Sequence, residues 1–416
     1  MANRAELAGR FFKAATPTAI GLAVAEGRLT VDDRLVDHFP DLVPADAGDL
    51  LKAIRIRHLL TMSSGHEQAR FLPLYRPSPN RAAILADVPA VEPGSRFDYS
   101  NSCSYMLAAL VERVTGETLA DYLGPRIFAP LGIERRHWLR TEEGVTNGGW
   151  GLHLTTRELA RFGQLYLDRG RHHGRQLIPE AWIDEATSKQ IDSWNQAALH
   201  DWRLGYGYQF WRGSHGSYRM DGLMGQFCVV LPALDAFVVT TAGTLRTQRL
   251  LELIWEVVVP TLGGSAPPPP PDTPLRPLSP TSPRFGELAG RVFRIGERIV
   301  LPTRLYDGQS PLATFAITAG NDGLELIAAD ETARYRLRVG TEDWVGGTTP
   351  FGTGYPEPYR ARGGWETASR FVVDLVFTEA GYRLSLAFDL DTAQVGLTLP
   401  LNPGLEGRLV IGRPFP

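Results

Sequence analysis

The sequence predicts an α/β protein in which an antiparallel sheet is flanked by helices and a helical subdomain, followed by a small all-β domain. Residues 13–27 are apolar nearly all round, which is typical of a helix buried in a large core. From about residue 204 the apolar residues alternate or run together between Gly and Pro, a pattern that favours antiparallel strands. Beyond a proline-rich stretch at 261–283, strand-like runs recur.

The composition is that of a globular protein, and 416 residues are enough for two or three domains. The net charge of −3 gives no indication of a nucleic-acid or membrane surface. Cys103 and Cys228 lack metal-ligand spacing and are compatible with a reducing cytoplasm. Since the chain shows neither a signal peptide nor an apolar run of about 18 residues, we expect a cytoplasmic location, unless an N-terminal signal has been lost.

The first helix should run through the apolar stretch and stop at Gly27. Lys13 lies at its start, and a buried lysine is costly unless it has a partner or a task. The helical subdomain follows, with helices expected at Arg81–Asp87, Ser104–Glu112 and Leu119–Phe128. Thr155 or Thr156 should cap the next helix, with Glu158 returning the hydrogen bond, and another helix should span Glu180–Thr187.

The sheet should follow these helices. Strands are expected at Leu204–Trp211, Gly225–Leu231 and Ala236–Thr241, and a long apolar helix, Gln248–Val259, should pack on them. We therefore divide the chain into a first domain at 1–260, a proline-rich linker at 261–283 and an all-β domain at 284–416.

The all-β domain should be a sandwich or a barrel. Its strand-like runs are Gly290–Ile295, Ala313–Ile317, Leu324–Ile327, Tyr335–Val339, Arg370–Phe377, Tyr382–Phe388 and Val395–Pro400. No catalytic constellation is visible in it, so we expect a structural appendage; a lid, a substrate-selecting role or a dimerising role is the alternative.

Several motifs recur in the order found in one known family. Lys13 is followed by Ala25–Leu29 (AEGRL), Asp32-Asp33 and His58–Gly65 (HLLTMSSG). This series resembles the penicillin-recognising serine hydrolases, in the class C β-lactamase-related branch of esterases, D-aminopeptidases and carboxypeptidases. The resemblance covers roughly the first two thirds of the chain. It implies a β-lactamase/transpeptidase-like fold and acyl-enzyme hydrolysis of an ester, amide or small peptide.

The resemblance also implies roles for particular residues. Lys13 matches the lysine of S-x-x-K, which is desolvated so that it can hold or pass a proton. Tyr99 and Asn101 match Y-x-N, in which the tyrosine acts as base or proton relay and the asparagine orients the lysine and the substrate carbonyl. Met220-Asp221-Gly222 aligns with the third box, K-T-G or H-x-G, so Asp221 and Gly222 should lie at the substrate, the Gly222 backbone completing the oxyanion hole.

These roles imply no metal and no cofactor, and the expected partner is a small-molecule or peptide substrate. The absence of a basic residue from the third box argues against recognition of a β-lactam carboxylate. The ordinary alternatives are a helix-terminal Lys13 with its head in solvent, a Tyr99 packed at a turn and an Asn101 that caps a helix.

Other polar residues are weaker candidates. His66-Glu67 lacks the second histidine of a zinc motif, and His172-His173 sits in a Gly-flanked turn. Ser63 and Ser64 match the structural turn of the family and have no lysine one helical turn away.

Arg10 departs from the pattern because it stands three residues before Lys13, where the family has its serine nucleophile. A guanidinium has no acceptor and cannot lose its proton at working pH, so we expect the chain as written to be inactive. Three readings remain open. They are a serine hydrolase whose recorded start is wrong, a non-catalytic relative that binds a ligand or partner in the former cleft, and an incomplete product that lacks two strands. Substrate and oligomeric state stay open.

Overall fold

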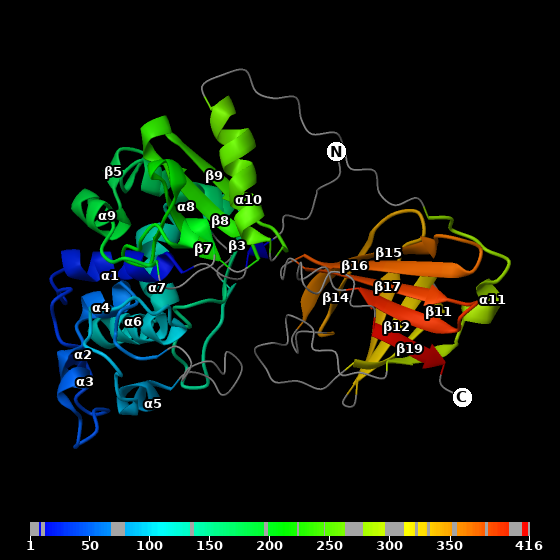
Figure 1. The fold of residues 1–416 in the computed structure, drawn as a ribbon, viewed down its shortest axis with the longest axis horizontal. Helices are drawn as coiled ribbons and strands as arrows, with labels where there is room; N and C mark the ends of the chain where they lie inside the picture. Colours follow the sequence, from blue (N-terminus) through cyan, green and yellow to red (C-terminus); the bar gives the residue numbers. More distant parts are fainter. Residues whose placement is uncertain are drawn as a thin grey trace. The chain divides into compact units, whose positions relative to one another are not determined.

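The computed structural model divides into two compact units (Figure 1). The N-terminal unit comprises the described residues of Ala8–Ala242 and Thr247–Ala266, and the C-terminal unit comprises those of Gly243–Arg246 and Pro267–Pro416. The structure describes residues 8–9, 13–67, 80–133, 137–194, 199–222, 224–244, 246–262, 278–295, 312–320, 323–330, 333–351, 356–378, 382–398 and 410–414. Arg10 and most of the predicted linker lie outside these ranges.

Helix α1 (Ala15–Ala25) lies in the main core of the N-terminal unit, as its uniformly apolar sequence predicts. It packs against α6 (Asn101–Thr115), which ends at Gly116 in the left-handed conformation that favours glycine. The remaining helices of the subdomain are α2 (Leu35–His38), α3 (Asp49–Ala53), α4 (Ile56–Leu60), α5 (Arg81–Ala86), α7 (Leu119–Leu123) and the π-helical turn η2 (Gly124–Phe128).

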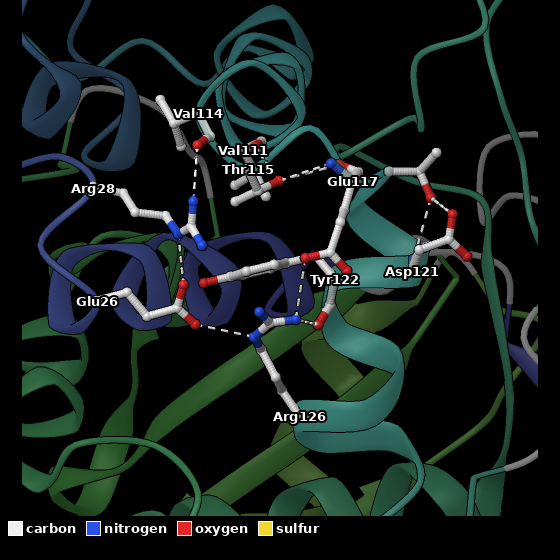
Figure 2. Close-up of polar contacts among 10 residues, drawn as sticks. Glu26, Arg28, Val111, Val114, Thr115, Glu117, Asp121, Tyr122 and Arg126 are labelled. Atoms are coloured by element: carbon white, nitrogen blue, oxygen red, sulfur yellow. Dashed lines mark hydrogen bonds and ion pairs between the residues drawn. The ribbon is translucent and has the colours of Figure 1, made fainter.

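Polar contacts fix the far end of α1 to this subdomain (Figure 2). Glu26 accepts hydrogen bonds from Arg28 Nε at 2.6 Å and from Arg126 Nε of η2 at 3.0 Å. Arg28 Nη1 also donates to the Val114 carbonyl of α6 at 3.2 Å. Each pair is partly exposed and contributes little alone, but the network joins three helices. These contacts lie at the end of α1 opposite to Lys13.

A four-stranded antiparallel sheet forms the second layer, in the order β6 (Trp211–Arg212), β7 (Tyr218–Gly222), β8 (Gln226–Leu231) and β9 (Ala236–Thr240). Alternate residues of β8 face two cores. Cys228 and Val230 join the main core, while Phe227, Val229 and Leu231 pack with Leu251 and Ile254. The sheet is accordingly covered by α8 (Thr156–Leu167) and by α10 (Thr247–Leu253) with η6 (Ile254–Val258) (Figure 1).

A shorter three-stranded sheet lies in the same unit. Its order is β1 (Ala8–Gly9), β3 (Leu152–Thr155) and β2 (His137–Trp138), so Gly9 pairs with Leu154. The other elements are β4 (Arg171–His172), β5 (Arg175–Gln176), α9 (Glu180–Thr187), η3 (His200–Trp202), η4 (Ser214–Gly216), η5 (Pro232–Leu234) and η7 (Val259–Thr261).

Local predictions for this unit fare differently. The capping box of α8 is confirmed: Thr155 Oγ1 accepts from Glu158 N at 3.2 Å, and Glu158 Oε2 accepts from Thr155 N at 2.8 Å. The strand predicted at 204–211 is wrong, because only Trp211 enters a strand. Gly205 and Gln209 take positive φ angles of 114° and 62°, and these break an extended run. None of the helices in the ranges described above is both long and apolar enough to cross a bilayer.

The C-terminal unit is built on one ten-stranded antiparallel sheet, in the order β13-β12-β11-β10-β19-β18-β17-β16-β15-β14. The strands are β10 (Val292–Ile295), β11 (Leu312–Gly320), β12 (Gly323–Asp330), β13 (Arg334–Val339), β14 (Val345–Thr349), β15 (Glu357–Trp365), β16 (Arg370–Phe377), β17 (Tyr382–Asp389), β18 (Gln394–Thr398) and β19 (Val410–Pro414), preceded by α11 (Phe285–Leu288).

Rings from distant strands meet inside this sheet. Phe293 of β10 lies 5.2 Å from Phe388 of β17, and Phe351 lies within 6.5 Å of both Phe315 and Phe377, measured between ring centroids. A flat sheet could not bring these strands together, so the sheet folds over its core. These contacts agree with the expected all-β domain, and the choice between a sandwich and a barrel stays a prediction.

Candidate active site

Lys13 lies directly before α1 and is only 5% exposed. Its Nζ lies 3.8 Å from the centroid of the Tyr99 ring, and it finds no hydrogen-bond partner among the residues that the structure describes. Burial lowers the pKa of Lys13 to about 7, while Cys103 and Asp221 act in the opposite direction. The side chain is thus not a helix-terminal lysine that reaches solvent, and near neutral pH about half of it is uncharged.

Tyr99 reaches Lys13 from the segment before α6. The turn after α4 holds this segment through two backbone hydrogen bonds, from Asp98 N to the Met62 carbonyl and from Gly94 N to the Ser63 carbonyl, each 2.7 Å long. The Tyr99 ring also stacks on Trp211, with 5.8 Å between centroids and 22° between planes. The Tyr99 ring therefore has two contacts, one with the amine of Lys13 and one with Trp211 of strand β6.

Tyr206 and Phe97 complete an aromatic cluster around Tyr99. Tyr206 lies 6.5 Å from Tyr99 and 4.7 Å from Trp211, and Phe97 lies 5.0 Å from Tyr206, all between ring centroids. Phe97 and Tyr206 are completely or almost completely buried, and with Tyr99 and Trp211 they form an aromatic wall, of which the Tyr99 ring contacts Lys13.

Asn101 is the first residue of α6, but it does not cap the helix. That position belongs to Ser100, whose Oγ accepts from Ser102 N at 3.2 Å. The Asn101 side chain lies against Gly149, where an added Cβ would stand 3.3 Å from Asn101 Oδ1. The structure thus places Asn101 near the start of the helix that follows Tyr99, beside the Gly148-Gly149 turn, without a hydrogen bond between it and Lys13.

Asp221 and Gly222 end strand β7, opposite Phe227 and Gln226 of β8. Asp221 is an electrostatic neighbour of Lys13, and each group favours the charged form of the other. Burial nevertheless raises the pKa of Asp221 to about 6, against the lowering effects of Arg219 and Lys13. Desolvation therefore outweighs the attraction at both ends of this pair. Gly222 is the next residue along the strand, and residue 223 lies outside the described part of the chain.

Arg219 was missed by the sequence analysis, although it supports Asp221. It is completely buried, and its Nε donates to Asp221 Oδ2 at 3.1 Å while its Nη1 donates to the carbonyls of Asp201 and Arg212. Trp202 covers the guanidinium, with its ring centroid 4.5 Å away. The strand period of two puts Arg219 and Asp221 on one face, and that signal was available in the sequence.

The serines near the turn have partners of their own. Ser63 Oγ lies 2.7 Å from Thr61 Oγ1, and Ser64 Oγ lies 3.0 Å from His66 Nδ1. Cys103 Sγ donates a hydrogen bond to Ser64 Oγ at 3.5 Å. The charge of Lys13 acts on the same thiol and lowers its pKa, against the larger effect of burial. Together with the backbone bonds from this turn to the Tyr99 segment, these contacts agree with a structural role for the Ser-Ser-Gly turn.

Comparison with known proteins adds the family to this geometry. A family model described as Beta-lactamase matches residues 11–256. The chain belongs to the Beta-lactamase family. This membership accounts for the shared order of Lys13, the Ser-Ser-Gly turn and Tyr99, and it makes the chain a relative of the β-lactamase-related serine hydrolases.

Individual Beta-lactamase relatives are more distant. The chain is 32% identical to the 6-aminohexanoate-dimer hydrolase of Paenarthrobacter ureafaciens over 91 residues, 21% of this chain and 23% of that protein. It is 25% identical to penicillin-binding protein 4 of Amycolatopsis lactamdurans over 323 residues, 67% of this chain and 84% of that protein. A solved penicillin-binding protein homologue from Caulobacter crescentus is 19% identical, with a TM-score of 0.46 over 60% of this chain and 83% of that chain.

Proposed function

We propose that the N-terminal unit carries the cleft of a serine hydrolase that cleaves an ester, an amide or a small peptide by acyl-enzyme chemistry. The observation that carries this proposal is the contact between Lys13 Nζ and the Tyr99 ring. An acyl transfer needs a group that can accept a proton near neutral pH, and the pKa of Lys13 at about 7 suits it for that work. Tyr99 then relays the proton to the leaving group.

We assign the substrate-binding residues from the same region of the N-terminal unit. Asn101 and the strand end at Asp221 and Gly222 lie on the elements that flank Lys13 and Tyr99, and we assign them to the substrate. Small amides are the class we favour, since a relative of this chain is named as a 6-aminohexanoate-dimer hydrolase. The buried carboxylate of Asp221 disfavours a substrate with a carboxylate at this position.

This chain differs from its family at the position of the nucleophile. A hydroxyl on the same helix face as Lys13 would stand at position 10, and the sequence has Arg10 there. A guanidinium neither attacks a carbonyl nor accepts a proton. We therefore propose that the chain as written does not form an acyl-enzyme.

A non-catalytic relative that binds a ligand is the second candidate. The observation in its favour is that Arg10 stands at the position of the nucleophile, and a guanidinium cannot replace a hydroxyl in the acyl transfer. In that case the aromatic wall and Asp221 bind a small molecule without cleaving it.

A fluorophosphonate probe with intact-mass detection separates these candidates. The unaltered chain should stay unlabelled, and Arg10→Ser should take up one equivalent. Arg10→Ser combined with Lys13→Met is the matched control, which should stay unlabelled because the base is absent. Stoichiometric labelling of the unaltered chain would refute its inactivity, and peptide mapping to Ser63, Ser64 or Ser100 would identify a different nucleophile.

A further inference from the structure

Strand β13 of the C-terminal unit carries a row of three arginines. Arg334, Arg336 and Arg338 are exposed, and the residues between them are buried in the core of this unit. The strand period of two places the three side chains on one face, with Cα atoms about 7 Å apart. Arg336 pairs with Glu325 of β12 at 3.0 Å, whereas Arg334 and Arg338 have no carboxylate partner among the described residues. Because like charges at this spacing repel each other, the row does not stabilise the sheet.

Further arginines extend this row onto neighbouring strands. Gly340, which follows β13, accepts a hydrogen bond from Gly363 N of β15 at 2.8 Å, so β15 lies beside the end of β13. Arg360 and Arg362 alternate with core residues of β15, and Arg383 precedes a core residue of β17, so all three lie on the side of the sheet away from the core. We call these six residues of β13, β15 and β17 the arginine face: Arg334, Arg336, Arg338, Arg360, Arg362 and Arg383.

The charge of the arginine face is only partly neutralised. Besides the pair of Arg336 with Glu325, Arg383 pairs with Asp374 of β16 at 2.7 Å. Within residues 284–416 the acidic residues slightly outnumber the arginines, and lysine is absent. The positive charge is therefore a local concentration on these strands, which is the charge pattern of a surface that binds an anionic partner.

We propose that the arginine face binds an extended acidic peptide segment of a partner protein, in which Asp or Glu occupies every second position. A guanidinium binds a carboxylate through two parallel hydrogen bonds. An extended peptide points every second side chain to one side, about 7 Å apart, which matches the row on β13. A single-stranded nucleic acid fits less well, because the described residues of this unit offer no exposed aromatic ring on which bases could stack. This binding needs no nucleophile, so it goes beyond the proposed hydrolase function.

Fluorescence anisotropy with the full chain and two labelled peptides tests the spacing. Glu and Thr alternate in the first peptide, of about twelve residues, and the second has the same composition with all Glu residues in one block. Both peptides carry the same charge, so a difference in affinity reports the match of spacing. We expect the alternating peptide to bind at least about threefold more tightly, and equal affinities would overturn the proposal.

Two double variants locate the binding surface. Arg334→Ser with Arg338→Ser should weaken binding of the alternating peptide at least about tenfold, because two charge-assisted contacts are lost. Arg171→Ser with Arg175→Ser removes the same charge from the exposed strands β4 and β5 of the N-terminal unit and should bind like the parent. Equal affinities of the two variants would overturn the proposal.

Two controls complete the test. Circular dichroism checks that each variant folds, and Arg334→Ser alone, at an exposed site, replaces the double variant if that one does not; it should weaken binding at least about threefold. Oligo(dT) and phosphatidylserine vesicles are measured in parallel. If either binds the parent more tightly than the alternating peptide and loses binding in the Arg334 variant, the partner class is wrong.

Discussion

Lys13 Nζ lies over the face of the Tyr99 ring, at 3.8 Å from its centroid, although Lys13 precedes α1 and Tyr99 precedes α6. The contact places a positive charge, when Lys13 is protonated, against the negative face of an aromatic ring. It offsets only part of the cost of burial, since the pKa of Lys13 still falls to about 7. The site therefore holds an amine that changes charge near neutral pH.

The shifted pKa of Lys13 should make stability rise with pH. The folded value is about 7 and the ordinary value is 10.5, so between these values the unfolded chain binds more protons than the folded chain. The free energy of unfolding should then increase by about 2 kcal/mol from pH 7 to pH 9, relative to Lys13→Met. Below about pH 6 the contribution is constant, because Lys13 is then protonated in both states. Urea unfolding of both proteins at the two pH values measures it, and parallel pH dependences would contradict it.

Tyr99→Phe should separate the ring from the hydroxyl. The phenyl ring still lies under Lys13, so the melting temperature should change little, while loss of the proton relay should slow fluorophosphonate labelling in the Arg10→Ser background by roughly 10²–10⁴. Tyr208→Phe is the control, because the Tyr208 hydroxyl donates a hydrogen bond of 2.6 Å to Glu185 and makes no contact with Lys13. That variant should lose stability and keep its labelling rate. An unchanged rate in Tyr99→Phe would remove Tyr99 from the mechanism.

Arg219→Ala should destabilise the N-terminal unit by about 3–5 kcal/mol, because it leaves the buried Asp221 carboxylate without its strongest partner. Arg34→Ala breaks the exposed pair with Asp37 and should have little effect. Guanidinium chloride unfolding compares the two. Equal stabilities of the two variants would show that the buried pair contributes no more than a surface one.

Gly21→Ala should also destabilise this unit. A Cβ at Gly21 would stand 2.3 Å from Trp182 Nε1, so α1 and α9 would have to separate or the indole would have to move, at a cost of about 1–3 kcal/mol. Gly286→Ala in α11 meets open space and should be neutral or slightly stabilising. Thermal unfolding tests the pair, and a melting temperature of Gly21→Ala equal to that of the parent would mean that the packing is looser than described.

The proline-rich segment at 261–283 should be the first site of limited proteolysis. Its composition favours an extended spacer, which offers its backbone to a protease. Intact-mass analysis at low protease concentration should find two protected fragments that meet within this segment. First cuts between residues 100 and 250 would place the domain boundary elsewhere.

The sequence predicted correctly those helices and caps that depend only on residues close together in the chain. The capping box of Thr155 and Glu158 and the helix Glu180–Thr187 depend on adjacent residues and appear as predicted. The all-β region was recognised, but β14, β15 and β19 were missed. In β14 the sequence Val345-Gly346-Gly347-Thr348-Thr349 has hardly any apolar alternation. Its place is set by pairing with β15, which a single sequence does not display.

At the candidate site, motif positions indicated Lys13 and Tyr99, and the structure puts them in contact. The support around them was not visible in the same way. Trp202 and Trp211 lie far along the chain from Lys13 and reach the site only because the loop before β6 turns through Gly205 and Gln209. Three-dimensional packing of this kind leaves no regular spacing in the sequence.

Strand β19 lies between β10 and β18, so the strand that comes last in the chain fills a central place in the ten-stranded sheet. Every other neighbouring pair in this sheet is formed by consecutive strands, and can form as soon as the chain has left the ribosome. The sheet must wait for residues 410–414, and until then β10 and β18 both present unpaired edges. Until β19 is in place, the edges of β10 and β18 are available to strands of other chains, so we expect self-association to compete with folding of this unit at that stage.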